Sequence, residues 1–152
     1  MEMIRCDAAF IKAYFDDFTA LYEELLLVHY PDISDAPEHS RAHINKLIKY
    51  LEDGIAVIFS AVDKGRPVGF IHSYERSFLH ERRLFIEGLM VDAGYRKMSL
   101  GSRLIDAAEA YARENGIDAV EVMVTTNNPG AVRFYEKCGM ETVRLHMKKD
   151  MI

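Results

Sequence analysis

The apolar residues of this chain change their spacing several times, and each change marks a predicted element. A short strand is expected at residues 3–6, and from 8 to 29 the apolar residues recur at helical intervals, which predicts one long amphipathic helix. Turn-forming residues fill 29–37, and helical spacing returns from 37 to 53, where Gly54 ends a second helix. The N-terminal third is therefore expected to contain a strand and two helices.

A change to β-rich runs follows the second helix. Residues 55–62 and 67–74 are rich in β-branched and aromatic side chains, and the turn between them contains Gly65. Two such runs around a glycine-containing turn predict an antiparallel hairpin. A further strand is expected at 83–91, so the middle of the chain is predicted to build most of a sheet.

A second long amphipathic helix is expected beyond this sheet. It occupies residues 100–115, ends at Gly116, and separates the strand at 83–91 from another strand at 119–124. A strand, a helix and a strand in this order favour a right-handed crossover with parallel pairing of the two strands.

Two shorter elements complete the pattern. Pro129 begins a helix that continues to Cys138, and a final strand is expected after Gly139. Because the sequence contains no repeats, linkers or low-complexity tracts, residues 1–152 are expected to form a single domain. The alternation of helices and strands predicts an α/β (α+β) fold.

The composition limits which cellular compartment and which binding partners we expect. The net charge of -5 argues against nucleic acid as a partner and slightly favours a cationic substrate. The only two cysteines, Cys6 and Cys138, do not make a disulfide framework and indicate a reducing compartment. The N-terminus does not resemble a signal peptide, and no apolar run is long enough to span a bilayer. We therefore expect a cytoplasmic protein with no membrane partner.

The turn at residues 96–102 carries the first chemical signal. It follows a buried strand, begins with Arg96 and Lys97, and contains three small residues before the long helix. Small residues allow a ligand to approach the backbone, and the first amides of a helix have no internal acceptor. This arrangement suits phosphate groups, although neither GxGxxG nor GxxxxGK[ST] is present. The alternative is a solvated turn with two surface cations.

A second motif, later in the chain, supports a phosphate-binding role for the turn. In the GNAT family of N-acetyltransferases, a turn of the form Arg/Gln-x-x-Gly-x-Gly/Ala binds the cofactor pyrophosphate, and residues 96–101 resemble it with Ser99 in place of the first glycine. The family's later signature is Asn-x-x-Ala-x-x-Phe/Leu-Tyr-Glu-Lys-x-Gly-Phe. It appears here, with methionine replacing the last aromatic residue, as Asn128, Ala131, Phe134, Tyr135, Glu136, Lys137, Gly139 and Met140. The chain is thus similar to this family in two motifs, in the family's order.

The resemblance implies a fold and a cofactor. The fold would be a mixed central sheet of about six strands flanked by about four helices, splayed at the cofactor-binding strand. The cofactor would be acetyl-CoA as acetyl donor, and the enzyme would acetylate a primary amine of a small molecule or an exposed peptide. The implied cofactor contacts lie on the strand before the turn, on the turn and in the later motif: Leu89, Met90, Val91, Arg96, Lys97, Met98, Ser99, Leu100, Gly101, Ser102, Asn128 and Tyr135.

The implied reaction assigns two catalytic roles. Tyr135 would protonate the departing thiolate, and Glu87 would act as general base for the amine, through water. Each residue has a structural alternative: Tyr135 as a core aromatic, and Glu87 as the ion-pair partner of Arg83 or of another basic neighbour. Asn128 has an alternative role too, as the cap of the last helix, which does not exclude a contact with the cofactor.

The acceptor side is less defined. In the family the loop between the first helices lines the acceptor pocket, and here that loop offers His29 and Tyr30 as substrate-binding residues. The carboxylates of Asp32 and Asp35 in the same loop could receive a cationic amine, or could serve solubility alone. His39 and His43 have a spacing that can bind a metal, but no third ligand is evident, and we expect no metal site. A homodimer is possible, because many relatives form one. The alternatives to an enzyme are a non-catalytic acyl-CoA sensor and an interaction protein.

Overall fold

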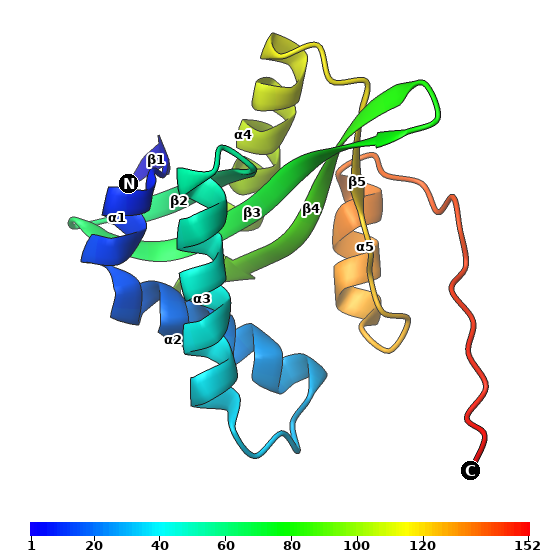
Figure 1. Cartoon of the computed structure of the whole chain (residues 1–152), viewed down its shortest axis with the longest axis horizontal. Coiled ribbons are helices and arrows are strands. Elements are labelled where there is room, and N and C mark those ends of the chain that lie inside the picture. The colour runs from blue at the N-terminus through cyan, green and yellow to red at the C-terminus, as the bar shows by residue number, and fades with distance from the viewer. The chain divides into compact units, whose positions relative to one another are not determined.

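A five-stranded sheet forms the centre of the first 122 residues (Figure 1). Its strands lie side by side in the order in which they occur in the sequence, and neighbours are antiparallel except for the last pair, which is parallel. They are β1 (Glu2–Arg5), β2 (Ala56–Asp63), β3 (Arg66–Phe78), β4 (Glu81–Val91) and β5 (Ala119–Val122). The structure is a computed structural model that describes all 152 residues.

Helices cover both faces of this sheet (Figure 1). Three helices, α1 (Ala8–Ala13), α2 (Phe15–His29) and α3 (Ala36–Glu52), pack on one face, and α4 (Leu100–Glu114) packs on the other. A short 3-10 helix, η1 (Ala93–Tyr95), follows β4. The mixed α/β class predicted from the sequence is confirmed, with five sheet strands instead of about six.

The single helix predicted at 8–29 is two helices. The chain leaves helical geometry at Tyr14, whose φ and ψ are -116° and 33°, and this residue ends α1 and begins α2. The apolar spacing continues across the break, because Ile11 and Phe18 are both fully buried. The prediction was therefore wrong about continuity and correct about which face is buried.

The larger core lies between the sheet and the first three helices. Phe18 of α2 meets Phe70 of β3 edge to face, with ring centroids 5.0 Å apart, and neither side chain is exposed to solvent. Burial of one such side chain contributes roughly 1.5–3 kcal/mol to folding. The cores on both faces fix β3 and β4, which position the candidate site.

The sheet opens at the C-terminal half of β4. Pairing between β4 and β5 runs only from Arg83 opposite Ala119 to Ile86 opposite Val122. Residues 88–91 of β4 keep their partners on β3 but have none on the side of β5. This is the splayed strand that the resemblance implied, and it leads directly into the turn before α4.

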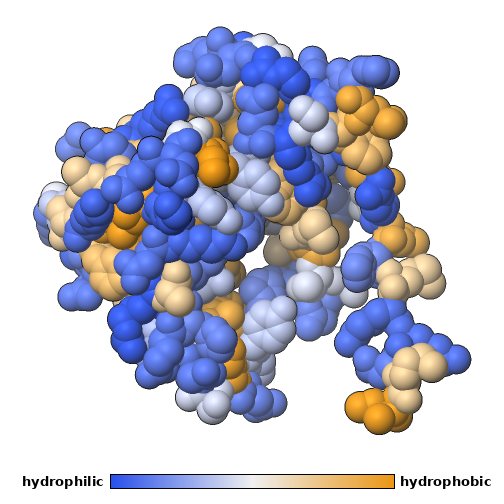
Figure 2. All heavy atoms as spheres, in the orientation of Figure 1, coloured by the Kyte–Doolittle hydropathy of each residue, from blue (hydrophilic) through white to orange (hydrophobic).

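The contacts of the chain divide it into two compact units, Met1–Val122 and Met123–Ile152. The second unit contains one helix, α5 (Pro129–Lys137), and the predicted single domain stays a prediction. The strand predicted after Gly139 is absent, since residues 140–152 form neither helix nor strand. Apolar and polar residues do alternate there, but the segment has no strand partner, and its apolar side chains are exposed (Figure 2): Val143, Leu145 and Met147.

No helix is both long enough and apolar enough to cross a membrane.

Candidate functional site

The candidate site begins at an irregularity in β4. His72 of β3 lies opposite Gly88, and the next residue, Ser73, lies opposite Ile86, so Glu87 is an extra residue in the ladder. Such a β-bulge redirects a side chain and often occurs beside a functional site. Gly88 leaves room for the neighbouring ring, because a Cβ there would lie 3.4 Å from Cε1 of His72. The sequence thus builds a local bend that directs Glu87 toward His72.

Glu87 contacts a buried histidine. Its Oε2 lies 3.3 Å from Nε2 of His72, a side chain that is only 2% exposed. The ion pair with Arg83 that the sequence allowed is absent, because Arg83 bonds to Glu81 and Glu121 instead. The carboxylate of Glu87 therefore remains available on the face of the sheet that α1, α2 and α3 cover.

A second histidine extends this cluster toward α2 and α3. The ring of His43 lies 5.1 Å from that of His72 and stacks on Tyr22 at 3.9 Å. Neither nitrogen of His72 forms a regular hydrogen bond, and neither does the buried Nε2 of His43. Unpaired buried polar atoms are uncommon and mark a place where a polar ligand or an ordered network can bind.

The charges of the cluster are set by its burial. Desolvation lowers the pKa of His43 to about 4, with a further contribution from His72, so this imidazole is neutral at pH 7. The contact with His72 lowers the pKa of Glu87 and outweighs the opposing effect of burial. At neutral pH the cluster thus contains the ionised carboxylate of Glu87 and the neutral imidazole of His43.

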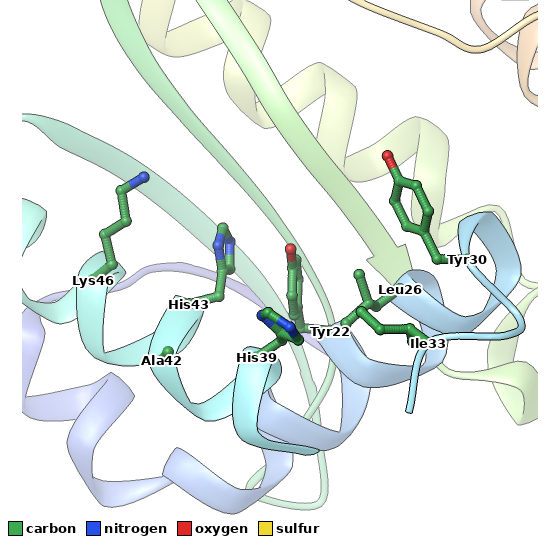
Figure 3. A pocket seen from close by; sticks show the side chains of 8 residues that line it. All are labelled: Tyr22, Leu26, Tyr30, Ile33, His39, Ala42, His43 and Lys46. Carbon is green, nitrogen blue, oxygen red and sulfur yellow. The ribbon is translucent and has the colours of Figure 1, made fainter. Parts of the chain in front are cut away.

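A hollow of about 390 Å³ opens beside the cluster, between α2 and α3 (Figure 3). The side chains of Tyr22, His43 and Lys46 point to the same side of the two helices in this view. Tyr30, one of the two predicted substrate residues, lines the hollow, whereas His29 does not. The full lining is Tyr22, Leu26, Tyr30, Ile33, His39, Ala42, His43 and Lys46.

In the turn after β4, Ser99 adopts the backbone conformation that glycine would favour at this position. Ser99 has φ 57° and ψ 24°, the left-handed conformation, and it is the N-cap of α4 without a side-chain capping bond. The first bond of the helix runs from the N–H of Arg103 to the carbonyl oxygen of Ser99, at 3.1 Å. The three amides between them, 100–102, have no intrahelical acceptor and remain available to an anion.

The cations of this turn have different surroundings. Arg96 donates to the carbonyl oxygen of Val91 at 3.3 Å and to Glu24 of α2 at 2.6 Å, which holds its guanidinium beside the turn. Lys97 is exposed and forms no ion pair. No acidic residue occupies the first turn of α4. The turn therefore presents positive charge and free amides together.

Replacing Ser99 with glycine is expected to raise the free energy of unfolding by about 1 kcal/mol, because a left-handed conformation costs an L-residue roughly 1–2 kcal/mol and glycine little. Denaturant unfolding measures this difference. Ser102→Gly is the matched control: the same substitution two positions inside the helix is expected to lower the free energy by about 0.5–1 kcal/mol. Destabilisation by both substitutions would contradict the left-handed turn.

The remaining predicted site residues lie in the second unit. Asn128 is the N-cap of α5, and its Oδ1 accepts a hydrogen bond from the N–H of Ala131 at 3.3 Å, as the structural alternative anticipated. Tyr135 lies on α5, where burial, with a smaller effect of Cys138, raises its pKa to about 12. Its phenol is therefore protonated at neutral pH.

Sequence reasoning did not identify His72, Tyr22 or Lys46. The available signal was the alternation in β3, where Phe70 and His72 share the face that packs on the helices. A histidine at a core position of a strand could have been noticed, whereas its contact with Glu87 could not, because His72 pairs with Gly88. The bulge that joins them is not visible in the residue pattern.

Comparisons with known proteins place the chain in a family. The family model for the acetyltransferase (GNAT) family matches residues 12–140. An uncharacterized N-acetyltransferase of Methanocaldococcus jannaschii is 31% identical over 133 residues, which are 83% of this chain and 56% of that protein. An uncharacterized N-acetyltransferase of Bacillus subtilis is 28% identical over 137 residues, which are 89% of this chain and 84% of that protein.

Solved structures share the fold. An aminoglycoside N-acetyltransferase in complex with CoA has a TM-score of 0.75 at 16% identity, over 99% of this chain and 95% of that one. The chain spans just over half the length of the Methanocaldococcus relative, 56%. Because the family model covers most of the sequence and both predicted motifs, the chain belongs to the acetyltransferase (GNAT) family.

Proposed function

We propose that this protein transfers the acetyl group of acetyl-CoA to a primary amine. The observation that carries the proposal is the course of β4. This one strand holds the ionised carboxylate of Glu87 at its bulge, loses its partner on one side after Ile86, and leads into the amide-rich turn at Ser99. Family membership and the CoA complex of a structural neighbour support the same reading.

Residues 96–102 fit the phosphates of acetyl-CoA. The free amides at the start of α4 would donate hydrogen bonds to pyrophosphate oxygens, and the helix dipole favours negative charge there. Arg96 and Lys97 would add positive charge from the same turn. The backbone of Leu89 and Val91, on the splayed part of β4, would hydrogen-bond the extended arm of the cofactor.

Glu87 would prepare the amine. A primary alkyl amine has a pKa near 10, so it arrives mainly as ammonium and must lose a proton before it attacks. The ionised Glu87 attracts the cation and accepts the proton through water, while His72 holds the carboxylate in place. The neutral nitrogen then forms a bond with the thioester carbonyl carbon, the bond from that carbon to sulfur breaks, and the nitrogen releases one further proton to solvent to give the amide.

Tyr135 would complete the reaction by giving its proton to the departing thiolate. Its raised pKa of about 12 keeps the phenol protonated until that moment. A thiolate with a pKa near 8.5 is a weaker base than this phenolate, so Tyr135 must recover its proton quickly from solvent. We retain it as the candidate acid because it stands in the family's motif.

Replacing Tyr135 with phenylalanine is expected to lower kcat by about 10²-fold, since general acid catalysis contributes roughly 10²–10⁴-fold. The affinity for acetyl-CoA should be nearly unchanged, because phenylalanine preserves the ring. Thiol release at saturating substrate measures the first quantity, and calorimetry measures the second. A variant with the turnover of wild type would exclude Tyr135 from the mechanism.

The proposal is tested first by titrating the protein with acetyl-CoA in a calorimeter, with CoA and dephospho-CoA for comparison. Micromolar binding, followed by thiol release with a panel of amines, is the expected result. Binding of acetyl-CoA without thiol release from any amine would indicate a non-catalytic acyl-CoA sensor. Failure to bind any of the three would overturn the proposed function.

A further inference from the structure

The hollow between α2 and α3 has an unusual charge pattern for a site that receives amines. None of its eight lining residues carries a carboxylate. Lys46 is its one permanent charge, because the imidazole of His43 is neutral at pH 7. His39, about two turns before Lys46 on the same face of α3, contacts the carboxylate of Asp35 at 3.2 Å. A second ammonium group entering this hollow would meet positive charge.

Lys46 is available to a ligand. It is exposed and forms no ion pair, and its Nζ lies 5.3 Å from the centre of the Tyr50 ring one turn further along α3. Lys49, on the same helix, differs, because its Nζ lies 3.6 Å from the carboxylate of Asp53. The helix thus holds one lysine that is paired with a carboxylate and one that lines the hollow and has no carboxylate partner.

The carboxylate of Glu87 supplies negative charge close to the residues that line the hollow. Glu87 does not line the hollow, but it interacts electrostatically with three residues that do: Tyr22, His43 and Lys46. Its carboxylate contacts His72 and is not within ion-pair distance of Lys46. Glu87 and Lys46 therefore lie near the same hollow without forming an ion pair with each other.

The rest of the lining is apolar or aromatic. Leu26, Ile33 and Ala42 supply aliphatic surface, and the rings of Tyr22 and Tyr30 border it (Figure 3). A volume of about 390 Å³ is at the small end of the range for small-molecule pockets. A compact ligand with one apolar group matches this space better than a large polar one.

We propose that the acceptor is a zwitterionic amine with an apolar side chain, of the α-amino acid class, whose carboxylate binds Lys46 while its amino group faces Glu87. This inference rests on the proposed acetyl transfer and adds the substrate class. The apolar side chain packs against Leu26 and Ile33. Polycations are disfavoured, because they lack the anion that Lys46 attracts and bring a second cation to it.

Matched probes test the inference. Leucine, leucinamide and isopentylamine share the same aliphatic group, but only leucine carries a carboxylate. We expect wild type to show a kcat/KM for leucine about tenfold higher than for the other two, as for a charge-assisted contact, and higher than for spermidine. In Lys46→Met the preference for leucine should disappear, whereas Lys49→Met should retain it.

Equal kcat/KM values for leucine and leucinamide in wild type, or a preference for spermidine, would overturn the inference while leaving acetyl transfer intact. Calorimetric binding of the same three probes in the presence of CoA gives a readout without turnover. Selective binding of leucine that Lys46→Met abolishes, without thiol release, would uphold the site and reject acetyl transfer. Binding without selectivity would overturn the site.

Discussion

Replacing Glu87 with glutamine is expected to lower kcat by roughly 10²–10³-fold, the size of a lost general base. Glutamine preserves the shape of the side chain at the bulge, but it has no negative charge and cannot accept the proton of the amine. Because Glu87 lies apart from the turn at 96–102, the affinity for acetyl-CoA should stay within about twofold of wild type. Thiol release at saturating substrates and calorimetric titration measure the two quantities.

The pH dependence gives the same experiment a second readout. The base must be ionised, and the contact with His72 lowers the pKa of Glu87 below its ordinary value. Wild-type turnover should therefore persist to a lower pH than an unperturbed carboxyl group allows, and decline as the pH falls through the lowered pKa. This acidic limb should be absent from Glu87→Gln.

Glu75→Gln is the control for Glu87→Gln. Glu75 also lies in the β3–β4 hairpin, where its carboxylate accepts hydrogen bonds of 2.8 Å from Arg82, an exposed pair away from the bulge. Exposed ion pairs contribute about 0–1 kcal/mol to stability, so this variant should fold and turn over normally. Wild-type kcat in Glu87→Gln would assign the base elsewhere, and a loss of kcat in both variants would indicate a defect of the hairpin.

The sequence was most informative where a pattern is local. Apolar spacing predicted the first residue of α4, Leu100, and both ends of α3 to within one residue. These helices bury one continuous face, which makes the spacing easy to recognise. The spacing did not reveal the break at Tyr14, since the same residues are buried whether the helix is continuous or bent. A strand was also expected after Gly139, where apolar and polar residues alternate, but alternation does not supply the partner that a strand requires.

The candidate site also has one part that the sequence predicts and one part that it does not. The turn at 96–102 is a contiguous motif, so its residue types indicated phosphate binding before the fold was known. The cluster of His43, His72 and Glu87 joins α3, β3 and β4, and its geometry depends on a bulge that the sequence pattern does not show. Glu87 was identified as a base only through the family resemblance, and its histidine partner emerged only in the structure.

Ser99 illustrates how a departure from a motif can leave its geometry intact. An L-residue such as serine disfavours positive φ. The residue instead adopts the left-handed conformation, so the amides of 100–102 are presented as a glycine would present them. The left-handed conformation lowers the stability of the fold, but the backbone arrangement proposed to bind phosphate is retained.

Replacing Gly101 with glutamate is expected to reduce the affinity for acetyl-CoA by at least about 100-fold. Gly101 is the second residue of α4, among the free amides that would contact the pyrophosphate. A carboxylate there adds bulk and a negative charge against the phosphates, and like charges about 4 Å apart repel by about 1–4 kcal/mol near a protein surface. Calorimetric titration with acetyl-CoA measures the change.

Unfolding does not account for the expected loss in Gly101→Glu. Gly101 does not have positive φ, so another residue fits its helical conformation, and an acidic side chain in the first turn of a helix stabilises it by about 0.3–1 kcal/mol. Thermal unfolding should therefore show a stable variant that fails to bind. Gly101→Gln adds similar bulk without charge, and weaker loss in that variant would assign most of the effect to electrostatic repulsion. Unchanged affinity in Gly101→Glu would show that the phosphate site is not at the start of α4. It would also contradict the role proposed for the free amides.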